Sequence, residues 1–159
     1  LSETFWNIRL VQLLETQVIN SPFFNVFLAA QIYKGDNALF SNGTKISYLI
    51  TLMGDVHHIF PKQYLRDNGY NERIQYNQIA NFTYLDTQVN KEISDDAPSV
   101  YFKNAVEQCE RGHTLYGNVS DIDALKQNME ENCIPSNIAN MDYSNYSEFL
   151  IARRKMMQK

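Results

Sequence analysis

Hydrophobic residues recur at helical spacing in the first part of the chain, between stretches of turn residues. The first such stretch runs to about residue 18 and predicts an amphipathic helix that packs on the core; its apolar positions are Trp6, Leu10, Leu13, Leu14 and Val18. Ser21 and Pro22 suit a helix N-terminus, so a second helix is expected over residues 23–33. Gly35 ends this helix. Because the helix has only a small polar face, we expect most of it to be buried.

Residues 45–53 fit both types of regular structure. Alternate positions are apolar, as in a strand; they are Ile46, Tyr48, Ile50 and Leu52. Thr44 as a cap and Gly54 as a terminator slightly favour a helix. The pattern therefore leaves the assignment open.

From residue 55 the pattern changes to short strands. Residues 56–60 form a strand candidate that Pro61 ends, and a helical turn over 62–67 precedes the turn at Asn68 and Gly69. Residues 82–85 form the second strand candidate, after which a helix capped by Asp86 runs to about residue 94. The expected order is strand, irregular excursion, strand and helix.

The last part of the chain returns to helices. They are expected over residues 98–108, over 121–132 with Ser120 as cap, and over 147–157. The whole predicts an α+β protein, with residues 1–159 as one mostly helical domain in three parts, 1–54, 55–97 and 98–159. Because Leu1 leads straight into a helical pattern, we expect a C-terminal fragment of a longer protein.

Composition and charge limit the function classes. A chain of 159 residues, of which 44% are hydrophobic and 20% charged, can bury one sizeable core. Its net charge of -4 argues against strong binding to nucleic acid by this domain alone, because such binding depends on lysine and arginine. Near the strand candidates, Lys62, Arg66 and Lys91 are the predicted phosphate contacts of a local basic rim, with Arg73 as a neighbour. The interleaved carboxylates of Asp67, Glu72, Asp86 and Glu92 favour an ordinary mixed surface equally well.

Membrane and redox signals are absent from the sequence. No apolar stretch approaches the roughly 20 residues that span a bilayer, and the start lacks a basic region followed by a cleavage site. We therefore expect a cytoplasmic protein without a membrane partner. Cys109 and Cys133 lack CxxC spacing, which predicts reduced thiols rather than a disulfide or a zinc site.

The candidate chemistry lies in the run Asp55-Val56-His57-His58-Ile59-Phe60-Pro61. Successive strand residues point to opposite faces, so one imidazole can hold a cation while the other removes a proton from water. Asn90, in the helix after the second strand, can offer a carboxamide oxygen, a hard ligand compatible with magnesium or manganese. Asn81 is suited to hydrogen-bonding the excursion and holding the histidine segment in shape.

These residues resemble the HNH, or ββα-metal, endonuclease motif. The resemblance implies an embedded ββα-metal fold and assigns the metal-ligand role to His57 and the general-base role to His58. It makes Asn81 the structural asparagine of the catalytic motif and Asn90 the residue that completes the metal site. It also implies hydrolysis of DNA phosphodiester bonds to 5′-phosphate and 3′-hydroxyl ends.

A wider resemblance covers most of the chain. Four stretches resemble the C-terminal nuclease region of GmrSD-like proteins, bacterial modification-dependent restriction factors; they are Arg9-Leu10-Val11, Val18-Ile19-Asn20-Ser21-Pro22, Phe27-Leu28-Ala29-Ala30-Gln31 and Tyr76-Asn77-Gln78-Ile79-Ala80-Asn81. The resemblance implies a role in defence against foreign or modified DNA. It further implies an upstream ParB-like, nucleotide-hydrolysing domain of the same protein, whose Asp-Gly-Gln-Gln-Arg type of motif is absent here.

Two alternatives to a nuclease belong to other classes. The first is a non-catalytic module that retains the HNH shape and binds DNA or a protein, which the acidic charge favours and an intact His58 disfavours. The second is a metal-dependent hydrolase of small phosphate esters, which needs a closed pocket where a nuclease needs an open groove. DNA remains the expected partner.

Overall fold

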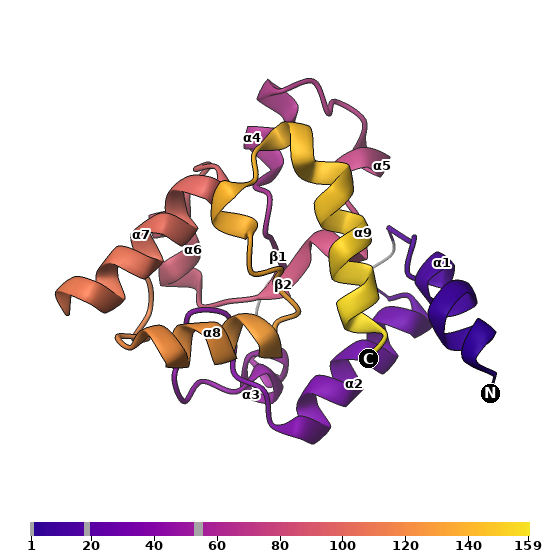
Figure 1. Cartoon of the computed structure of the whole chain (residues 1–159), viewed down its shortest axis with the longest axis horizontal. Coiled ribbons are helices and arrows are strands. Elements are labelled where there is room, and N and C mark those ends of the chain that lie inside the picture. Colours follow the sequence, from indigo (N-terminus) through magenta and orange to yellow (C-terminus); the bar gives the residue numbers. More distant parts are fainter. Residues whose placement is uncertain (1, 18–19, 53–55) are drawn as a thin grey trace.

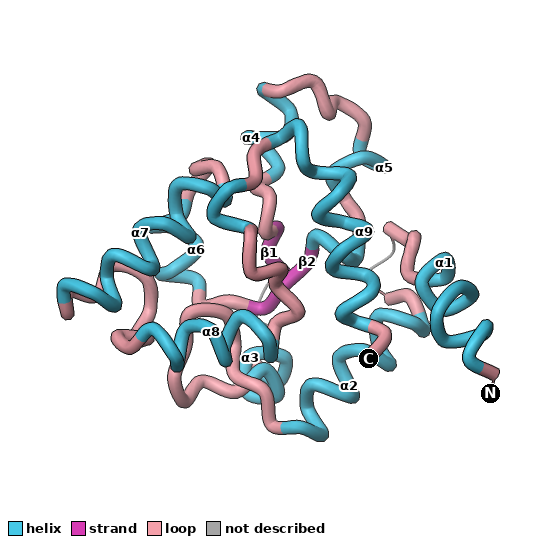
Figure 2. Tube along the Cα trace, in the orientation of Figure 1, coloured by secondary structure: helices cyan, strands magenta, loops and turns pink. Residues whose placement is uncertain are grey.

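Helices surround a small two-stranded antiparallel sheet in the computed structural model, which describes residues 2–17, 20–52 and 56–159 (Figures 1 and 2). The protein is thus mostly helical and of the α+β class, as predicted. The elements are, in chain order, the π-helix η1 (Phe5–Leu10), α1 (Val11–Leu13), α2 (Pro22–Lys34), α3 (Ile46–Thr51), β1 (Val56–His58), α4 (Lys62–Asp67), α5 (Arg73–Tyr76), the 3₁₀-helix η2 (Ile79–Asn81), β2 (Phe82–Tyr84), α6 (Thr87–Ile93), α7 (Pro98–Arg111), α8 (Ile122–Glu131), the 3₁₀-helices η3 (Ile138–Asn140) and η4 (Tyr143–Asn145), and α9 (Tyr146–Met157).

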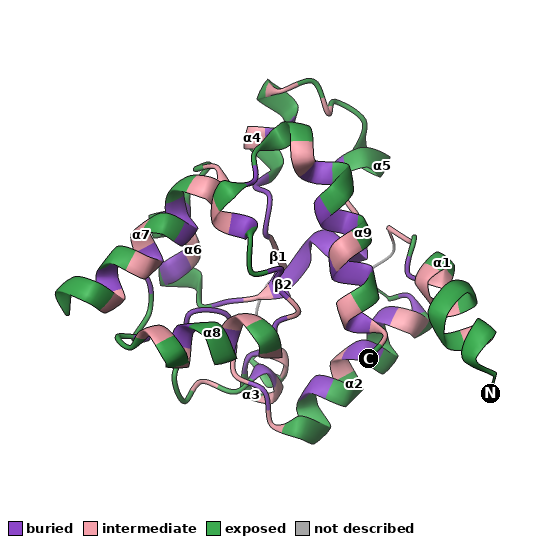
Figure 3. Cartoon of the chain, viewed as in Figure 1, coloured by how far each residue is buried: buried purple, intermediate pink, exposed green. Residues whose placement is uncertain are grey.

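One hydrophobic cluster connects the three parts of the sequence. It includes Leu14 from the first part, Phe60 from the second, and Phe102 and Phe149 from the third. Figure 3 shows the buried residues on the inward sides of the helices and the exposed residues on their outer sides. Within the described residues, no helix combines the length and apolarity that crossing a membrane requires.

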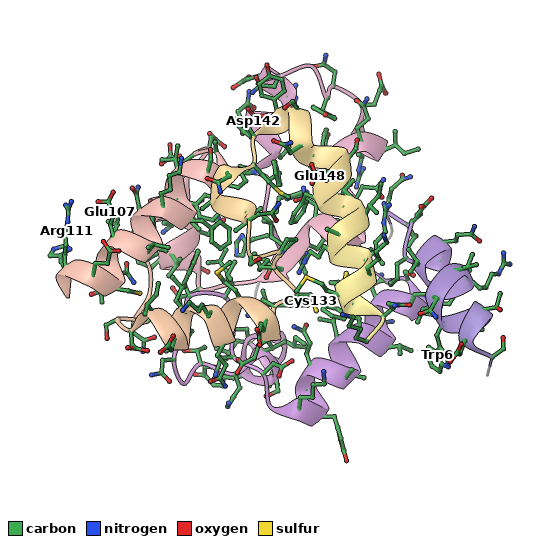
Figure 4. All side chains as sticks on the ribbon, viewed as in Figure 1. Trp6, Glu107, Arg111, Cys133, Asp142 and Glu148 are labelled. Atoms are coloured by element: carbon green, nitrogen blue, oxygen red, sulfur yellow. The ribbon has the colours of Figure 1, made fainter. Side chains whose placement is uncertain are left out.

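The N-terminal helical segment is shorter and more exposed than its sequence predicts. Its last helical residue is Leu13, and Val18 lies outside the described residues. Leu14 is buried, but Trp6 is 44% and Ile8 56% exposed. Figure 4 shows Trp6 at the periphery of the molecule. The expectation that this whole apolar stripe packs on the core was wrong, because η1 and α1 contain no buried residue and lie at the side of the molecule (Figure 1).

Helix α2 has the expected bounds but not the expected burial. Gly35 ends the helix with a left-handed backbone conformation at φ 74°, which glycine adopts without steric conflict. Phe24 and Phe27 are buried, whereas Val26 is 68% and Tyr33 94% exposed. The prediction of a buried helix was wrong, since only one side of α2 meets the core.

The segment that sequence left open is a helix. Ile46 and Leu49 lie one turn apart on α3 and pack with Ala38 in a small second cluster. The residue that precedes the helix is Lys45 rather than Thr44, and Gly54 lies outside the described residues. Tertiary packing of one helical face therefore decides between the two patterns.

A nearly buried carboxylate lies between α2 and α3. Asp36 is 9% exposed, and both its burial and the nearby Glu131 raise the pKa of its carboxyl group. We expect Asp36→Asn to stabilise the protein at neutral pH by up to about 1 kcal/mol, because the amide removes this repulsion. A carboxyl group whose pKa is raised by folding destabilises the protein as pH rises from the unfolded value of 3.8 through the folded value.

Urea unfolding of the parent and the Asp36 variant at acidic and neutral pH measures this difference. The variant's advantage should vanish below pH 3.8, where the parent carboxyl group is protonated in both states. Asp95→Asn, at an exposed position, is the matched control and should show no such dependence. Equal stability of the parent and Asp36→Asn at neutral pH would contradict the prediction.

The central part of the chain follows the expected order. β1 pairs antiparallel with β2, in the register Val56 to Tyr84, His57 to Thr83 and His58 to Phe82. Both strands are shorter than the predicted 56–60 and 82–85, and β1 ends where the chain bends at Ile59 and Phe60. Helix α4 coincides with the predicted turn over 62–67.

Helix α6 begins where its cap predicts. The Asp86 carboxylate accepts a hydrogen bond from the backbone N–H of Gln88 at 2.8 Å. In the last part of the chain, Asp121 rather than Ser120 caps α8, through bonds from the N–H groups of Asp123 and Ala124. The helices predicted over 98–108, 121–132 and 147–157 correspond to α7, α8 and α9.

The two cysteines are free thiols, as predicted. Cys109 and Cys133 are both half-buried, and burial raises the pKa of each. A raised pKa lowers the thiolate fraction at neutral pH, which disfavours nucleophilic reactivity of both thiols.

Candidate active site

The two histidines occupy opposite faces of the β1–β2 ladder. His57 is paired directly with Thr83, and His58 is paired with Phe82. Side chains alternate along a strand, so each imidazole shares a face with its cross-strand partner and not with the other imidazole. The sequence prediction that the two rings take separate tasks is compatible with this register.

The His58 ring is half-buried and held by aromatic neighbours. Its centroid lies 5.2 Å from that of Phe82 and 6.3 Å from that of Tyr76, each at a steep angle. Its Nε2 atom lies 2.9 Å from Oδ1 of Asn77. Burial lowers the pKa of His58; the hydrogen bond with Asn77 partly opposes this effect, and the Lys62 ammonium adds to it. The imidazole is therefore neutral around pH 7, the form that can accept a proton.

His57 lies in a more enclosed environment. Its side chain is half-buried, and its Nε2 atom is shielded from solvent. Across the ladder, the Oγ1 atom of Thr83 is buried without a hydrogen-bond partner among the described residues. Thus a ring nitrogen and a hydroxyl oxygen lie on the same covered face of the strand pair.

Asn81 ties together the two ends of the excursion. Its side chain is fully buried; Oδ1 accepts from the backbone N–H of Phe60 at 2.8 Å, and Nδ2 donates to the Phe60 carbonyl at 3.1 Å. The same amide donates to the Tyr76 carbonyl at 3.2 Å, and the Asn81 carbonyl accepts from the N–H of Ile59 at 2.8 Å. These four bonds fix the backbone immediately after His58.

Two distant side chains brace the same backbone. The Tyr101 hydroxyl donates to the Ile59 carbonyl at 2.6 Å. Arg153 on α9 is fully buried, and its Nη1 donates to the carbonyls of Ala80 at 2.9 Å and Phe82 at 2.6 Å. Its Nη2 and Nε donate to the Asn132 carbonyl, and burial lowers the pKa of Arg153 to about 10. The guanidinium remains charged at neutral pH and joins β2 to α9.

Asn90 lies in the middle of α6, which begins three residues after β2 ends. The side chain is half-buried, one turn before the buried Ile93, so it lies at the edge of the helix face that meets the core. Asp55, which precedes β1, lies outside the described residues.

The predicted phosphate contacts are on the surface. Lys62 and Arg66 are exposed one turn apart on α4, and Lys91 is exposed on α6. The Lys62 ammonium lies 5.4 Å from the ring centroid of Tyr76, the residue that also packs against His58. This contact brings one cation close to the imidazole.

By their chemistry, the predicted ligands would hold a hard divalent ion only with negative charge supplied by a substrate. Among residues 2–17, 20–52 and 56–159, no three histidine, cysteine, aspartate or glutamate side chains are grouped as for a metal ion. The candidate donors are the His57 imidazole, the Asn90 carboxamide and the Thr83 hydroxyl, none of which supplies a negative charge. Such donors suit manganese or magnesium when phosphate oxygens supply the negative charge.

Sequence reasoning missed the neighbours that hold the histidines. Asn77, Tyr101 and Arg153 contact the site from elsewhere in the chain, and no local pattern distinguishes them from other polar residues. The one sequence signal was the position of Arg153 among the apolar residues of its predicted helix, since a charged residue is rarely buried without partners.

No protein-family model, curated protein or solved structure matches this chain.

Proposed function

We propose that this chain is an HNH-type, metal-dependent DNA endonuclease domain. The observation that carries the proposal is the strand–excursion–strand–helix unit, in which the His57–His58 pair ends the first strand and a buried Asn81 is bonded across to Phe60. Asn90 then lies on the helix that follows. This combination of order and residue type supports a phosphodiester hydrolase over an unspecialised helical domain.

The general base in this proposal is His58. Its neutral ring takes a proton from a water molecule, which then attacks the phosphorus in line with the leaving oxygen. His57 and Asn90 would hold the divalent ion, and Thr83 is paired with His57 across the ladder. When bound, such an ion stabilises the charge that develops on the phosphate and on the leaving oxygen. Asn81 keeps the base in position through the backbone of Ile59 and Phe60.

The substrate in this proposal is DNA, held by an open basic rim. Lys62 and Arg66 on α4 and Lys91 on α6 contact phosphates, while the net charge of -4 keeps the affinity low and salt-dependent. The resemblance to GmrSD-like proteins adds a role in cytoplasmic defence against modified DNA. It also adds the upstream ParB-like nucleotide-hydrolysing domain as partner.

The test is nicking of supercoiled plasmid DNA, and of DNA carrying modified bases, with magnesium or manganese. We expect cleavage with either ion and none with a chelator. Asn90→Ala should lower the rate by about 10–100-fold at limiting metal, as expected for a weakened metal site, and lose less at high manganese. Gln88→Ala, an exposed change on the same helix, is the matched control.

Two other results would contradict the proposal in different ways. DNA binding without cleavage under all metal conditions would favour the non-catalytic module. Cleavage of a small phosphate ester but not of DNA would favour the hydrolase of small substrates.

A further inference from the structure

We propose that Asn77 is the positioning residue of His58. The side-chain oxygen of Asn77 holds the imidazole in the tautomer that carries its proton on Nε2. The catalytic meaning of this assignment rests on the proposed function. Its physical content, the proton position on a ring nitrogen, can be measured without cleavage. Asn77 lies at the end of α5, 19 residues after His58 in the chain.

The tautomer follows from the chemistry of the contact. Oδ1 of Asn77 lies 2.9 Å from Nε2 of His58, and a carboxamide oxygen can only accept a hydrogen bond. The ring nitrogen must therefore donate. A neutral imidazole carries one N–H group, so Nδ1 keeps its lone pair and can accept a proton from water.

Asn77 is itself held in place. Its backbone N–H donates to the Arg73 carbonyl at 3.0 Å, which closes the last turn of α5. The preceding carbonyl, of Tyr76, accepts from Asn81 Nδ2 at 3.2 Å and from the Tyr146 hydroxyl at 3.4 Å. The position of the amide is thereby fixed by the network that fixes the backbone after His58.

The ring has little freedom of its own. Tyr76 and Phe82 pack against it, which restricts its tilt but does not distinguish Nδ1 from Nε2. A rotation that exchanged the two nitrogens would keep these apolar contacts and break the bond to Asn77. The hydrogen bond is the interaction that selects which ring nitrogen carries the proton.

NMR of the ring nitrogens at mildly alkaline pH tests the assignment directly. We expect the parent to show a protonated Nε2 and a bare Nδ1 on His58. Asn77→Ala should give a mixture of tautomers, whereas Asn77→Asp, which keeps an acceptor oxygen at the same position, should retain the Nε2-protonated form. Asn68→Ala removes a half-buried asparagine that donates to the Tyr64 carbonyl, and as the control it should leave His58 unchanged.

Cleavage kinetics give the second readout. Asn77→Ala should lower kcat about 10–100-fold with KM nearly unchanged, because the ring that accepts the proton is misaligned while DNA contacts remain. Asn77→Asp should restore most of this loss. A folded Asn77→Ala variant with an unchanged tautomer and unchanged kcat would overturn the proposal.

The outcomes separate this proposal from the proposed function. Protonation of Nδ1 in the parent would show that the amide is turned with its NH₂ group toward the ring, and would overturn the assignment even if DNA is cleaved. If Nε2 is protonated and this preference is lost in Asn77→Ala while no variant cleaves DNA, the role of Asn77 stands and the nuclease function falls. Should Asn77→Ala fail to fold, protonation of Nδ1 in the parent or in Asn77→Asp would still overturn the assignment.

Discussion

Replacing His58 with alanine is expected to lower the rate of DNA cleavage by about 10²–10⁴-fold, the usual contribution of a general base. The imidazole is neutral at working pH because burial and Lys62 both lower its pKa. The bonds of Asn81 and Tyr101 to the adjacent backbone do not involve the ring, so the segment should keep its shape. Initial nicking rates at saturating manganese measure the effect.

The control for this loss is His113→Ala. His113 is an exposed residue outside the strand pair, so its removal should leave nicking unchanged. Circular dichroism and thermal melting of both variants check that the His58 variant is folded. Cleavage by His58→Ala at the parent rate would exclude His58 as the base.

Replacing Arg153 with methionine is expected to destabilise the fold by about 3 kcal/mol or more. Methionine fills a similar volume but donates no hydrogen bond, which leaves the carbonyls of Ala80, Phe82 and Asn132 without these donors in the core. Each buried polar group left unsatisfied costs about 1–3 kcal/mol. Urea unfolding followed by circular dichroism measures the change in free energy of unfolding.

Lys155→Met is the matched control on the same helix. Lys155 is exposed, so its replacement should change the stability by less than about 0.5 kcal/mol. Similar stabilities of the two variants would mean that the buried guanidinium contributes nothing beyond its volume. A folded Arg153→Met protein should also cleave more slowly, because the arginine holds the start of β2 opposite His58.

Residues that start, cap or end helices predict much of the helical structure from the sequence. Pro22 and Gly35 mark the ends of α2, and Asp86 marks the start of α6, because each residue acts through its own backbone geometry or a bond within one turn. The burial of α2 was not predictable in this way. It depends on how much of the remaining chain covers the helix, which no local pattern records.

The same distinction between local and long-range interactions applies to the candidate site. The histidine pair and the asparagines are visible in the sequence because their spacing follows the strands and helix that carry them. The residues that support them are not: Tyr101 bonds a backbone 42 positions earlier, and Arg153 one 71 positions earlier. Such contacts exist only once the chain has folded.

The bonds of Asn81 to Phe60 close a loop of 21 positions at its base, close to the imidazoles. Residues 71 and 72, near the far end of that loop, are exposed. Lengthening the loop there would raise the entropic cost of closing it only slightly, by about 0.6 kcal/mol for each doubling of its length. Relatives of this protein could therefore carry insertions of different sizes at this tip, and engineers could graft new recognition segments onto it, without moving the histidines of the candidate site.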